Sequence, residues 1–426
     1  MRLDKVRVVA KREYLSRIRS KTFWLTTVLL PLFMAAMFVG PVLIIARSTS
    51  HLEAVLVDGT GVLGPGIAER LSTRGPGVGA LAQVDLDLVA PAADRAAQRA
   101  ELDRRLLDEE IDAWIWLDRE GLAGGRAEYH ARSVSNTLTQ EQIEEAISIE
   151  VQKLRLTEAG FDPDVVEPLL EPVSLTTLKV SAAGSRAEAG EAGFFLAYGL
   201  FFMLYVVLLL WGQQVLQGVL EEKSSRVVEV IVSSVRPFEL MLGKLGGIGG
   251  AALTQFSIWL AAAVALTAPG LVSALGALPE DVGLPRITPV QALAIVVFFL
   301  LGFFVYASMF AAVGASFNNA QEAQQLSFLP TGFIILPVFF LFPVINDSNG
   351  TLAIVTSLIP PLTPILMPLR IAVEMPPLWQ VGLGVVLTAL FVVFMVGLCG
   401  RIYRVGILMY GKKPTLKEIW RWVGYA

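Results

Sequence analysis

QGVLEEKSSRVVEVIVSSVRPFELMLGK, residues 217–244, is the charged stretch between two long apolar runs around which the chain is organised. Apolar residues in it follow helical spacing, while Glu222 and Arg226 stand four residues apart on another face. Pro237 is expected to end this helix, because proline disfavours a helical predecessor and cannot donate a backbone bond. The stretch predicts a short charged helix at a membrane surface, 217–240, with an ordinary solvated loop helix as the alternative. Its charged side chains are Glu221, Glu222, Lys223, Arg226, Glu229, Arg236, Glu239 and Lys244.

The composition indicates a membrane protein. The 426 residues are 54% hydrophobic and only 17% charged, with a mean hydropathy of +0.61, whereas soluble domains have about 25% charged residues. Apolar runs near the ~20 residues that cross a bilayer recur along the chain. We therefore expect a polytopic α-helical membrane protein with six transmembrane helices, and membrane lipids as partners. The six predicted spans are 22–46, 193–216, 245–268, 288–314, 326–345 and 378–400.

Basic residues at both ends set the expected orientation. Residues 1–21 hold eight Lys or Arg and two acids, and Leu3, Val6, Ala10, Tyr14 and Ile18 repeat at helical spacing, which predicts an amphipathic interface helix at the cytoplasmic surface. The alternative is a basic flank that only orients the first span. The segment after Gly400 holds six Lys or Arg and one acid. By the positive-inside rule both termini, including the tail 404–426, are expected in the cytoplasm, with the protein in the plasma membrane.

Between the first two spans, residues 47–192 break the apolar pattern over a length typical of a domain. Residues 47–191 hold 26 acidic and 14 basic side chains. Mixed strand and helix patterns predict a large extracytoplasmic α/β domain. Strands are expected at 51–59, 111–118, 126–131 and 173–180, and helices at 94–110 and 139–160.

Residues 348–369 are uncharged and long enough to span a membrane, but they contain four prolines. A seventh span here would place the two termini on opposite sides. We therefore expect a re-entrant, proline-broken element within the membrane region 193–403, which must be covered by protein or line a cavity. The polar residues 318–325 just before the fifth span are expected to form a turn.

The sequence lacks several sets of residues that carry chemistry. It has no Gly-x-x-x-x-Gly-Lys-Ser/Thr motif for ATP and no paired-cysteine spacing for a metal. Gly243/Gly247 and Gly246/Gly250 therefore predict close helix contacts rather than a nucleotide loop. His51 and His130 are expected to be ordinary strand or surface residues, and Cys399 a packed thiol. We expect no catalytic site, no metal, no cofactor bound by this chain itself, and no nucleic-acid partner.

The expected spans also lack ionisable side chains, which argues against a proton- or ion-coupled carrier. Uncharged polar side chains at the ends of the second and third spans offer a possible translocation path. Hydrogen bonding between neighbouring helices is the alternative role for them. The path candidates are Gln213, Gln214, Gln217, Thr254 and Gln255.

These segments resemble the membrane subunit of type-2 ATP-binding-cassette exporters, in the branch that includes the sodium-efflux permease NatB. The resemblance covers nearly the whole chain, in the order of basic helix, span, large domain and five further spans. Three stretches carry it most clearly: 221–259, with Glu221-Glu222-Lys223 and Gly243-Lys244; 321–330, with Gln321-Glu322-Ala323-Gln324; and 360–370, with Pro360-Pro361-Leu362-Thr363-Pro364.

The resemblance implies a permease that hydrolyses nothing itself. It implies a separate cytoplasmic ABC ATPase subunit that binds ATP–Mg, and a second permease copy in a homo- or heterodimer. ATP-driven closure of the ATPases would tilt the permease spans, exporting sodium or a hydrophobic or amphiphilic compound. The residues that the resemblance makes candidates for ATPase coupling are Glu221, Glu222, Lys223, Arg226 and Glu229.

Two other function classes remain open from the sequence. One is a non-transporting membrane anchor or receptor that presents the extracytoplasmic domain. The other is a membrane-embedded hydrolase, which the missing nucleophile–base arrangement opposes.

Overall fold

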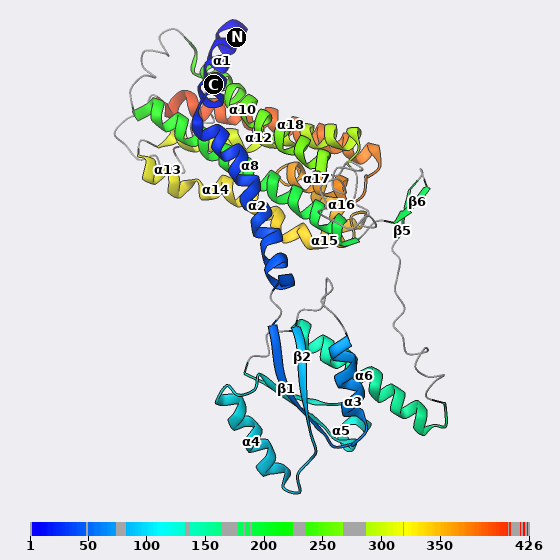
Figure 1. Ribbon diagram of the computed structural model, residues 1–426. Coiled ribbons are helices and arrows are strands. Elements are labelled where there is room, and N and C mark those ends of the chain that lie inside the picture. The colour runs from blue at the N-terminus through cyan, green and yellow to red at the C-terminus, as the bar shows by residue number, and fades with distance from the viewer. Residues whose placement is uncertain are drawn as a thin grey trace. The chain divides into compact units, whose positions relative to one another are not determined.

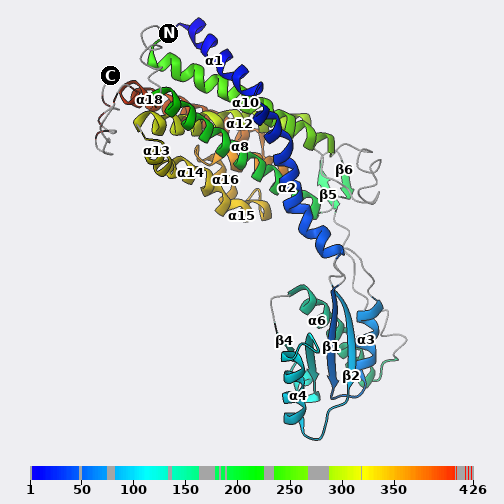
Figure 2. The same ribbon diagram turned by 60° about the vertical axis from the view of Figure 1, so that its left-hand side comes forward.

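A computed structural model of the protein describes residues 2–47, 50–73, 82–132, 137–162, 178–181, 184–187, 190–224, 235–266, 287–317, 319–407, 409, 418, 421 and 424. The chain divides into two compact units, one of residues 1–29 with 176–426 and the other of residues 30–175. Helix α2 (Lys21–Arg47) contains the boundary between them. Figures 1 and 2 show the elements of each unit.

The second unit is an α/β domain built on a four-stranded sheet. The strand order is β2-β1-β3-β4, in which β1 pairs in parallel with β2 and β3 and β4 is antiparallel to β3. The elements in chain order are β1 (Ser50–Asp58), α3 (Leu63–Thr73), β2 (Ala82–Val89), α4 (Arg95–Leu107), β3 (Ala113–Leu117), α5 (Arg119–Ala123), β4 (Glu128–Ala131) and α6 (Thr137–Glu158).

Both faces of this sheet are covered by helices, so β3 is apolar at every position and β1 is apolar over residues 54–57. Leu56 of β1 and Ile115 of β3 face the core formed with α3 and α6. Their neighbours Val57 and Trp114 face the opposite core, formed with α4. Side chains on successive strand positions alternate between the two cores.

The strands expected at 51–59, 111–118 and 126–131 and the helices expected at 94–110 and 139–160 are all present, with shifted ends. Asp94 caps α4 by accepting from the backbone N–H groups of Ala96 and Ala97. After α6, Gly160 adopts a φ of 93°, as expected for a helix stop. The expectation missed α3 and β2, whose turn-rich surroundings hide short elements. Only 178–180 of the last predicted strand lies in the described residues, in β5 (Leu178–Ser181), which pairs with β6 (Gly184–Ala187).

The first unit consists mainly of helices, with α12 packed against several of the others. Phe256 of α10 stacks on Phe299 of α12 with ring centroids 4.2 Å apart. The longer helices are α1 (Leu3–Ile18), α8 (Gly190–Ser224), α10 (Pro237–Leu266), α12 (Pro289–Ser316) and α18 (Leu378–Gly406).

Five helical stretches in the described part of the chain are long and apolar enough to cross a membrane: Leu196–Ser224, Pro237–Ala265, Pro289–Ser316, Ala320–Asn346 and Leu378–Gly406. The first span predicted from the sequence falls on α2, which contributes the shorter apolar stretch Lys21–Met34. The sixth span and the side of the membrane on which the sheet domain lies stay predictions.

A helix that ends just before Pro237 stays a prediction, and Pro237 itself is the first residue of α10. Proline is well accepted there, since the first turn of a helix has no partner for its N–H groups. Likewise, Gln217 to Ser224 continue α8 without a break. The two ends of the expected surface helix 217–240 therefore belong to the long helices α8 and α10. Residues 225–234 between them lie outside the described residues.

Residues expected as a polar turn before the fifth span are instead helical. Helix α13 (Ala320–Leu326) begins at its cap Asn319, whose side chain accepts from the N–H of Gln321. The chain continues through α14 (Phe328–Ile335), the 3-10 helix η1 (Leu336–Phe340) and α15 (Leu341–Asn346).

The stretch 348–369 forms α16 (Thr351–Leu358) and, after Pro360 and Pro361, the start of α17 (Thr363–Val373). The break at the prolines agrees with the expectation. Its depth in a membrane stays a prediction.

Candidate functional site: a buried ionic junction of three helices

Helix α1 packs directly on a glycine face of α10, seen in Figure 2. A Cβ on Gly243 would lie 2.7 Å from Val9 Cβ, and one on Gly247 would lie 2.5 Å from Glu13 Cβ. Both distances are too short for real side chains, so only glycine permits this approach. The helix contact predicted for Gly243 and Gly247 is confirmed, and its partner is the N-terminal helix.

This packing changes the interpretation of the N-terminal helix. Leu3, placed on its apolar face by the sequence pattern, is 67% exposed, whereas Glu13 is only 8% exposed. The face against α10 contains Val9, Ala10 and Glu13. The predicted face agrees with this packing at Ala10 and Tyr14, and the glycine surface of α10 also accepts the carboxylate of Glu13, which the pattern did not include. Contact of α1 with lipid stays a prediction.

Lys244 of α10 is the centre of a buried ionic cluster, defined here as the ionic junction of Glu13, Arg17, Glu222 and Lys244. Its Nζ lies 3.0 Å from Glu222 Oε1 of α8 and 3.6 Å from Glu13 Oε1 of α1. It also donates to the carbonyl of Gly218 at 3.2 Å. Lys244 is 3% exposed, and a charge at such depth is tolerated only with close partners.

The fourth member, Arg17 of α1, lies 3.4 Å from Glu13 Oε2. It also donates from Nη1 to Gln214 Oε1 of α8 at 3.2 Å. A Cβ on Gly218 would lie 3.1 Å from Arg17 Nη2 and 3.3 Å from Lys244 Nζ. A glycine in α8 therefore leaves room for both cations. The ionic junction ties α1, α8 and α10 together.

Two further buried charges hold the ends of these helices. Lys223, at 2% exposure, donates from Nζ to the carbonyl of Ala315 at 2.7 Å, near the C-terminus of α12. A cation there also complements the negative end of the helix dipole. Glu239, in the first turn of α10, accepts from the backbone N–H of Arg2 at 2.7 Å. It thereby fixes the beginning of α1 on the beginning of α10.

The candidate coupling residues occupy different positions. Lys223 is buried in α8 and Glu222 half-buried, and Glu221, in the same last turn, is exposed. Glu222 pairs with Lys244 rather than in the arrangement expected from its spacing to Arg226. Arg226 and Glu229 lie outside the described residues.

The candidate path residues are distributed over three helix contacts. Gln255 Oε1 accepts from Trp211 Nε1 at 2.7 Å, which joins α10 to α8. Thr254 Oγ1 lies 3.2 Å from the hydroxyl of Tyr14 on α1. Gln214 accepts from Arg17, as described above. Gln213 is half-buried and Gln217 exposed. The contacts of Gln214, Thr254 and Gln255 fit the alternative role of hydrogen bonding between helices, and a path formed by the five stays a prediction.

The expectation that the spans lack ionisable side chains is wrong for their ends. The apolar stretches Leu196–Ser224 and Pro237–Ala265 include Glu222, Lys223 and Lys244. The predicted spans were bounded at the nearest charged residues. The helices of the structure continue past those bounds and include these residues. Glu13 offered one signal, since it lies three residues after Ala10 on a face predicted to be apolar.

Another buried charge, separate from the ionic junction, lies at the proline-broken segment. Arg370 of α17 is 0% exposed. It donates from Nε to the carbonyl of Ser348 at 2.7 Å, from Nη1 to Ser357 Oγ at 2.8 Å and from Nη2 to Gln380 Oε1 at 2.8 Å. The guanidinium therefore joins α16, α17, α18 and the residues before α16. The family resemblance includes Arg370 at the end of the stretch 360–370 but gives no sign of this role.

His130 and Cys399, both singled out in the sequence, lie in packed surroundings. His130 stacks on Trp114 with centroids 3.7 Å apart, and Cys399 is buried. Among the residues that the structure describes, no group of three or more His, Cys, Asp or Glu side chains is placed to hold a metal ion.

The long apolar helices define a multi-pass membrane protein. Residues 21–400 match the model of a family described as ABC-2 family transporter protein, so the chain belongs to that family. Members of this family are membrane components of transporters and not themselves enzymes, and the family implies an ATPase partner in general.

Two relatives match almost end to end. The uncharacterized protein YhaP of Bacillus subtilis is 25% identical over 423 residues, which cover 98% of each chain. The uncharacterized protein MJ1024 of Methanocaldococcus jannaschii is 22% identical over 421 residues, covering 98% of this chain and 96% of the relative. No solved structure matches.

Proposed function

We propose that this chain is the permease subunit of an ABC exporter in the plasma membrane, with both termini in the cytoplasm. A separate ATPase binds ATP–Mg and docks on the surface formed by α1 and the segment that links α8 to α10. Two permease copies, identical or related, form the transport unit. Family membership supports the class, and the ionic junction supports the mode of coupling.

The ionic junction carries this proposal because it links the docking region to two spans. Glu13 of α1, Glu222 of α8 and Lys244 of α10 share one buried contact. A push on α1 is therefore transmitted to α8 and α10 together rather than absorbed by one flexible helix. Glycine contacts along α10 leave no loose packing between α1 and its neighbour.

Cargo moves out of the cytoplasm in this proposal. Apolar side chains are exposed along α18, including Leu390, Val393 and Phe394, and such surfaces fit lipid, a second permease copy or a hydrophobic or amphiphilic cargo. Sodium is the other substrate, on the resemblance to the NatB branch. Transport of each cargo into inverted vesicles distinguishes these two substrates.

A charge exchange tests the coupling mode. Glu222→Lys and Lys244→Glu singly place like charges in the ionic junction, while the double variant restores one pair of opposite sign. We expect each single variant to lower the stimulation of the co-purified ATPase by the permease, and the double variant to recover part of it. Arg404→Glu, at an exposed position near the end of α18 and outside the proposed docking surface, is the matched control for added negative charge.

The measurement is ATP hydrolysis by the ATPase that co-purifies with the tagged permease in nanodiscs. If no ATPase co-purifies and the inverted vesicles transport none of the cargo when ATP is supplied, the exporter proposal is wrong. Full ATPase stimulation in both single variants, with intact assembly, would instead reject coupling through the ionic junction. The first of these results leads back to the anchor or receptor alternative.

A further inference from the structure

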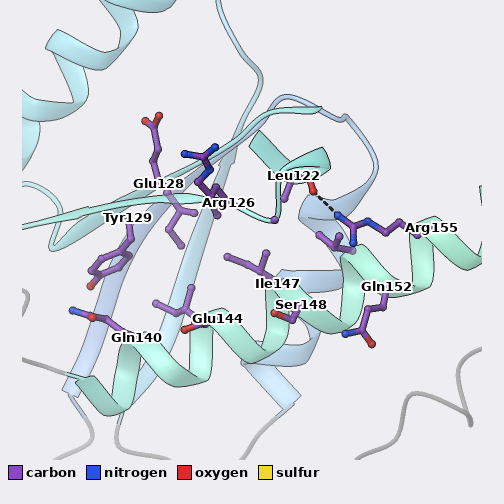
Figure 3. A pocket seen from close by; sticks show the side chains of 15 residues that line it. Leu122, Arg126, Glu128, Tyr129, Gln140, Glu144, Ile147, Ser148, Gln152 and Arg155 are labelled. Atoms are coloured by element: carbon purple, nitrogen blue, oxygen red, sulfur yellow. Dashed lines mark hydrogen bonds between the residues drawn. The ribbon is translucent and has the colours of Figure 1, made fainter. Parts of the chain in front are cut away.

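The α/β domain contains an open cavity between strand β4 and helix α6, shown in Figure 3. Its volume is about 460 Å³, within the range of small-ligand sites. Apolar side chains from three elements line its inner part: Ile115 of β3, Leu122 of α5, and Ile143, Ile147 and Val151 of α6. Nothing in the exporter function described above uses this cavity.

Strand β4 forms one wall of the cavity and is an edge strand. In the described sheet it pairs only with β3, through contacts such as Ile115 with Tyr129 and Trp114 with His130. Because pairing in an antiparallel ladder uses one side of a strand, alternate backbone N–H and C=O groups of β4 aim away from β3. An open edge of this kind is a template for another strand.

The opposite wall carries a row of polar side chains on α6. Gln140, Glu144, Ser148 and Gln152 recur every four residues, so they lie one above another on a single helix face. Figure 3 shows this row along α6, with Tyr129 of β4 reaching toward Gln140. The cavity therefore has an apolar floor, a backbone hydrogen-bonding wall and a polar side-chain wall.

Charged groups of both signs lie at the cavity. Glu144 is exposed on α6, and Arg126 is exposed just before β4. No ion pair is described for either in the residues that the structure covers. Arg155, by contrast, donates to the carbonyl of Leu122. A bound molecule that complements both groups has a cationic and an anionic group separated by an apolar part.

We propose that this cavity binds a short extended peptide, which adds to the sheet as a fifth strand beside β4. Main-chain groups of the peptide pair with the open edge of β4, and alternate apolar side chains enter the floor at Ile147. A basic residue of the peptide is placed at Glu144 and an acidic residue at Arg126. An extended peptide fits better than a compact amphiphile, because only a peptide satisfies the strand edge along its length.

The probe is the fluorescein-labelled peptide Lys-Thr-Val-Thr-Val-Thr-Glu with blocked ends, in which Lys, both Val and Glu share one face of the strand, measured by anisotropy with the full-length protein in nanodiscs. Its matched control is Lys-Thr-Val-Pro-Val-Thr-Glu, in which proline removes a backbone donor and opposes pairing. Hydrogen exchange of the β4 amides is followed in parallel. We expect saturable binding of the first peptide, at least about tenfold weaker binding of the second, and slower exchange at the β4 amides when the first is bound.

Two variants of α6 complete the test. Ser148→Trp fills the cavity at an exposed position, and Glu141→Trp adds the same side chain at an exposed position that does not line it. We expect Ser148→Trp to weaken peptide binding by about tenfold or more, since the tryptophan occupies the space of the ligand, and Glu141→Trp to leave it unchanged. Gln152→Trp provides a second blocking position should Ser148→Trp lower the melting temperature.

Several results would overturn the proposal. If the proline peptide binds as tightly as the first peptide, the cavity is a hydrophobic pocket in which the ligand does not pair with β4. β4 amides that are already protected without peptide show that another part of the chain occupies the edge. Absence of saturable binding, or binding unaffected by both blocking variants, shows that the cavity is not a peptide site. None of these results depends on ATPase stimulation, so the exporter proposal is tested separately.

Discussion

Lys244 and Glu222 form a buried ion pair, with Nζ and Oε1 3.0 Å apart, between helices that the sequence separates by a charged segment. The same ammonium group lies 3.6 Å from Glu13 of α1. One cation therefore neutralises carboxylates on two different helices. Loss of the cation leaves these carboxylates close together, with Arg17 as the remaining positive partner.

Lys244→Met is expected to lower the stability of the first unit. Breaking a buried charge pair from one side costs about 3–5 kcal/mol, because the remaining charges lose their compensation. The measurement is the midpoint of thermal unfolding in a fixed detergent. Lys11→Met is the control, since Lys11 is exposed on α1. An equal midpoint for the two variants would show that water already solvates the ionic junction.

Gly247→Leu is expected to release α1 from α10. Even a Cβ at this position meets Glu13 Cβ at 2.5 Å, so the helices must separate. Because α1 contains several Lys and Arg residues, trypsin should cleave the variant faster within residues 1–18. The readout is the rate of N-terminal cleavage by mass spectrometry.

The control for that experiment is Gly382→Leu in α18, where an added Cβ meets nothing within 4 Å. It makes the same chemical change without a steric conflict. Unchanged cleavage in Gly247→Leu would contradict the close packing of α1 on α10.

Arg370→Met is expected to loosen the contacts among α16, α17 and the start of α18. The substitution leaves the carbonyl of Ser348 and the side chains of Ser357 and Gln380 without their donor, and an unsatisfied buried polar group costs about 1–3 kcal/mol. Arg370→Lys should recover only part of the stability, because an ammonium cannot reproduce the planar fork.

Hydrogen exchange in peptides covering 348–380 is the appropriate measurement for Arg370. The matched control is Arg404→Met, at an exposed position near the end of α18. Equal protection in Arg370→Lys and the unaltered protein would show that charge alone suffices there.

The α/β domain is expected to lose stability in acid through Asp58. Burial raises the pKa of this carboxyl, but hydrogen bonds from Thr60 and Gly64 outweigh it, so the pKa lies below the ordinary value of 3.8. A lowered native pKa means that the contribution is complete above the unfolded value and declines as pH falls through the native one. The protection of β1 amides against hydrogen exchange should therefore decrease below about pH 4.

Asp58→Asn separates this effect from general acid unfolding. The amide retains acceptor capacity but has no carboxyl to titrate, so the part of the acid response due to Asp58 should disappear. Glu53→Gln, in the same strand, is the matched control. If Asp58→Asn has the same pH profile as the unaltered protein, other carboxylates determine acid stability.

The class of protein and most of its long helices could be predicted from the sequence because their signals are local. Apolar runs are long enough to cross a bilayer wherever the described part of the chain has its five long apolar helical stretches. Short strand-like runs bounded by turn or charged residues predicted β1, β3 and β4 of the sheet domain. The sequence did not reveal that Pro237 begins α10, because a proline fits equally after one helix and in the first turn of the next.

The candidate site is different, because its residues are far apart in the chain. Glu13, Glu222 and Lys244 acquire their common role only when the glycine face of α10 brings α1 within reach of α8. Sequence spacing paired Glu222 with Arg226, since local neighbours are all that spacing reveals. By itself the sequence determined a multi-pass membrane protein with a mixed α/β insertion, through hydrophobic length and periodicity. Which charges are buried together was decided by tertiary packing, because burial and partner choice depend on contacts between helices that are distant in sequence.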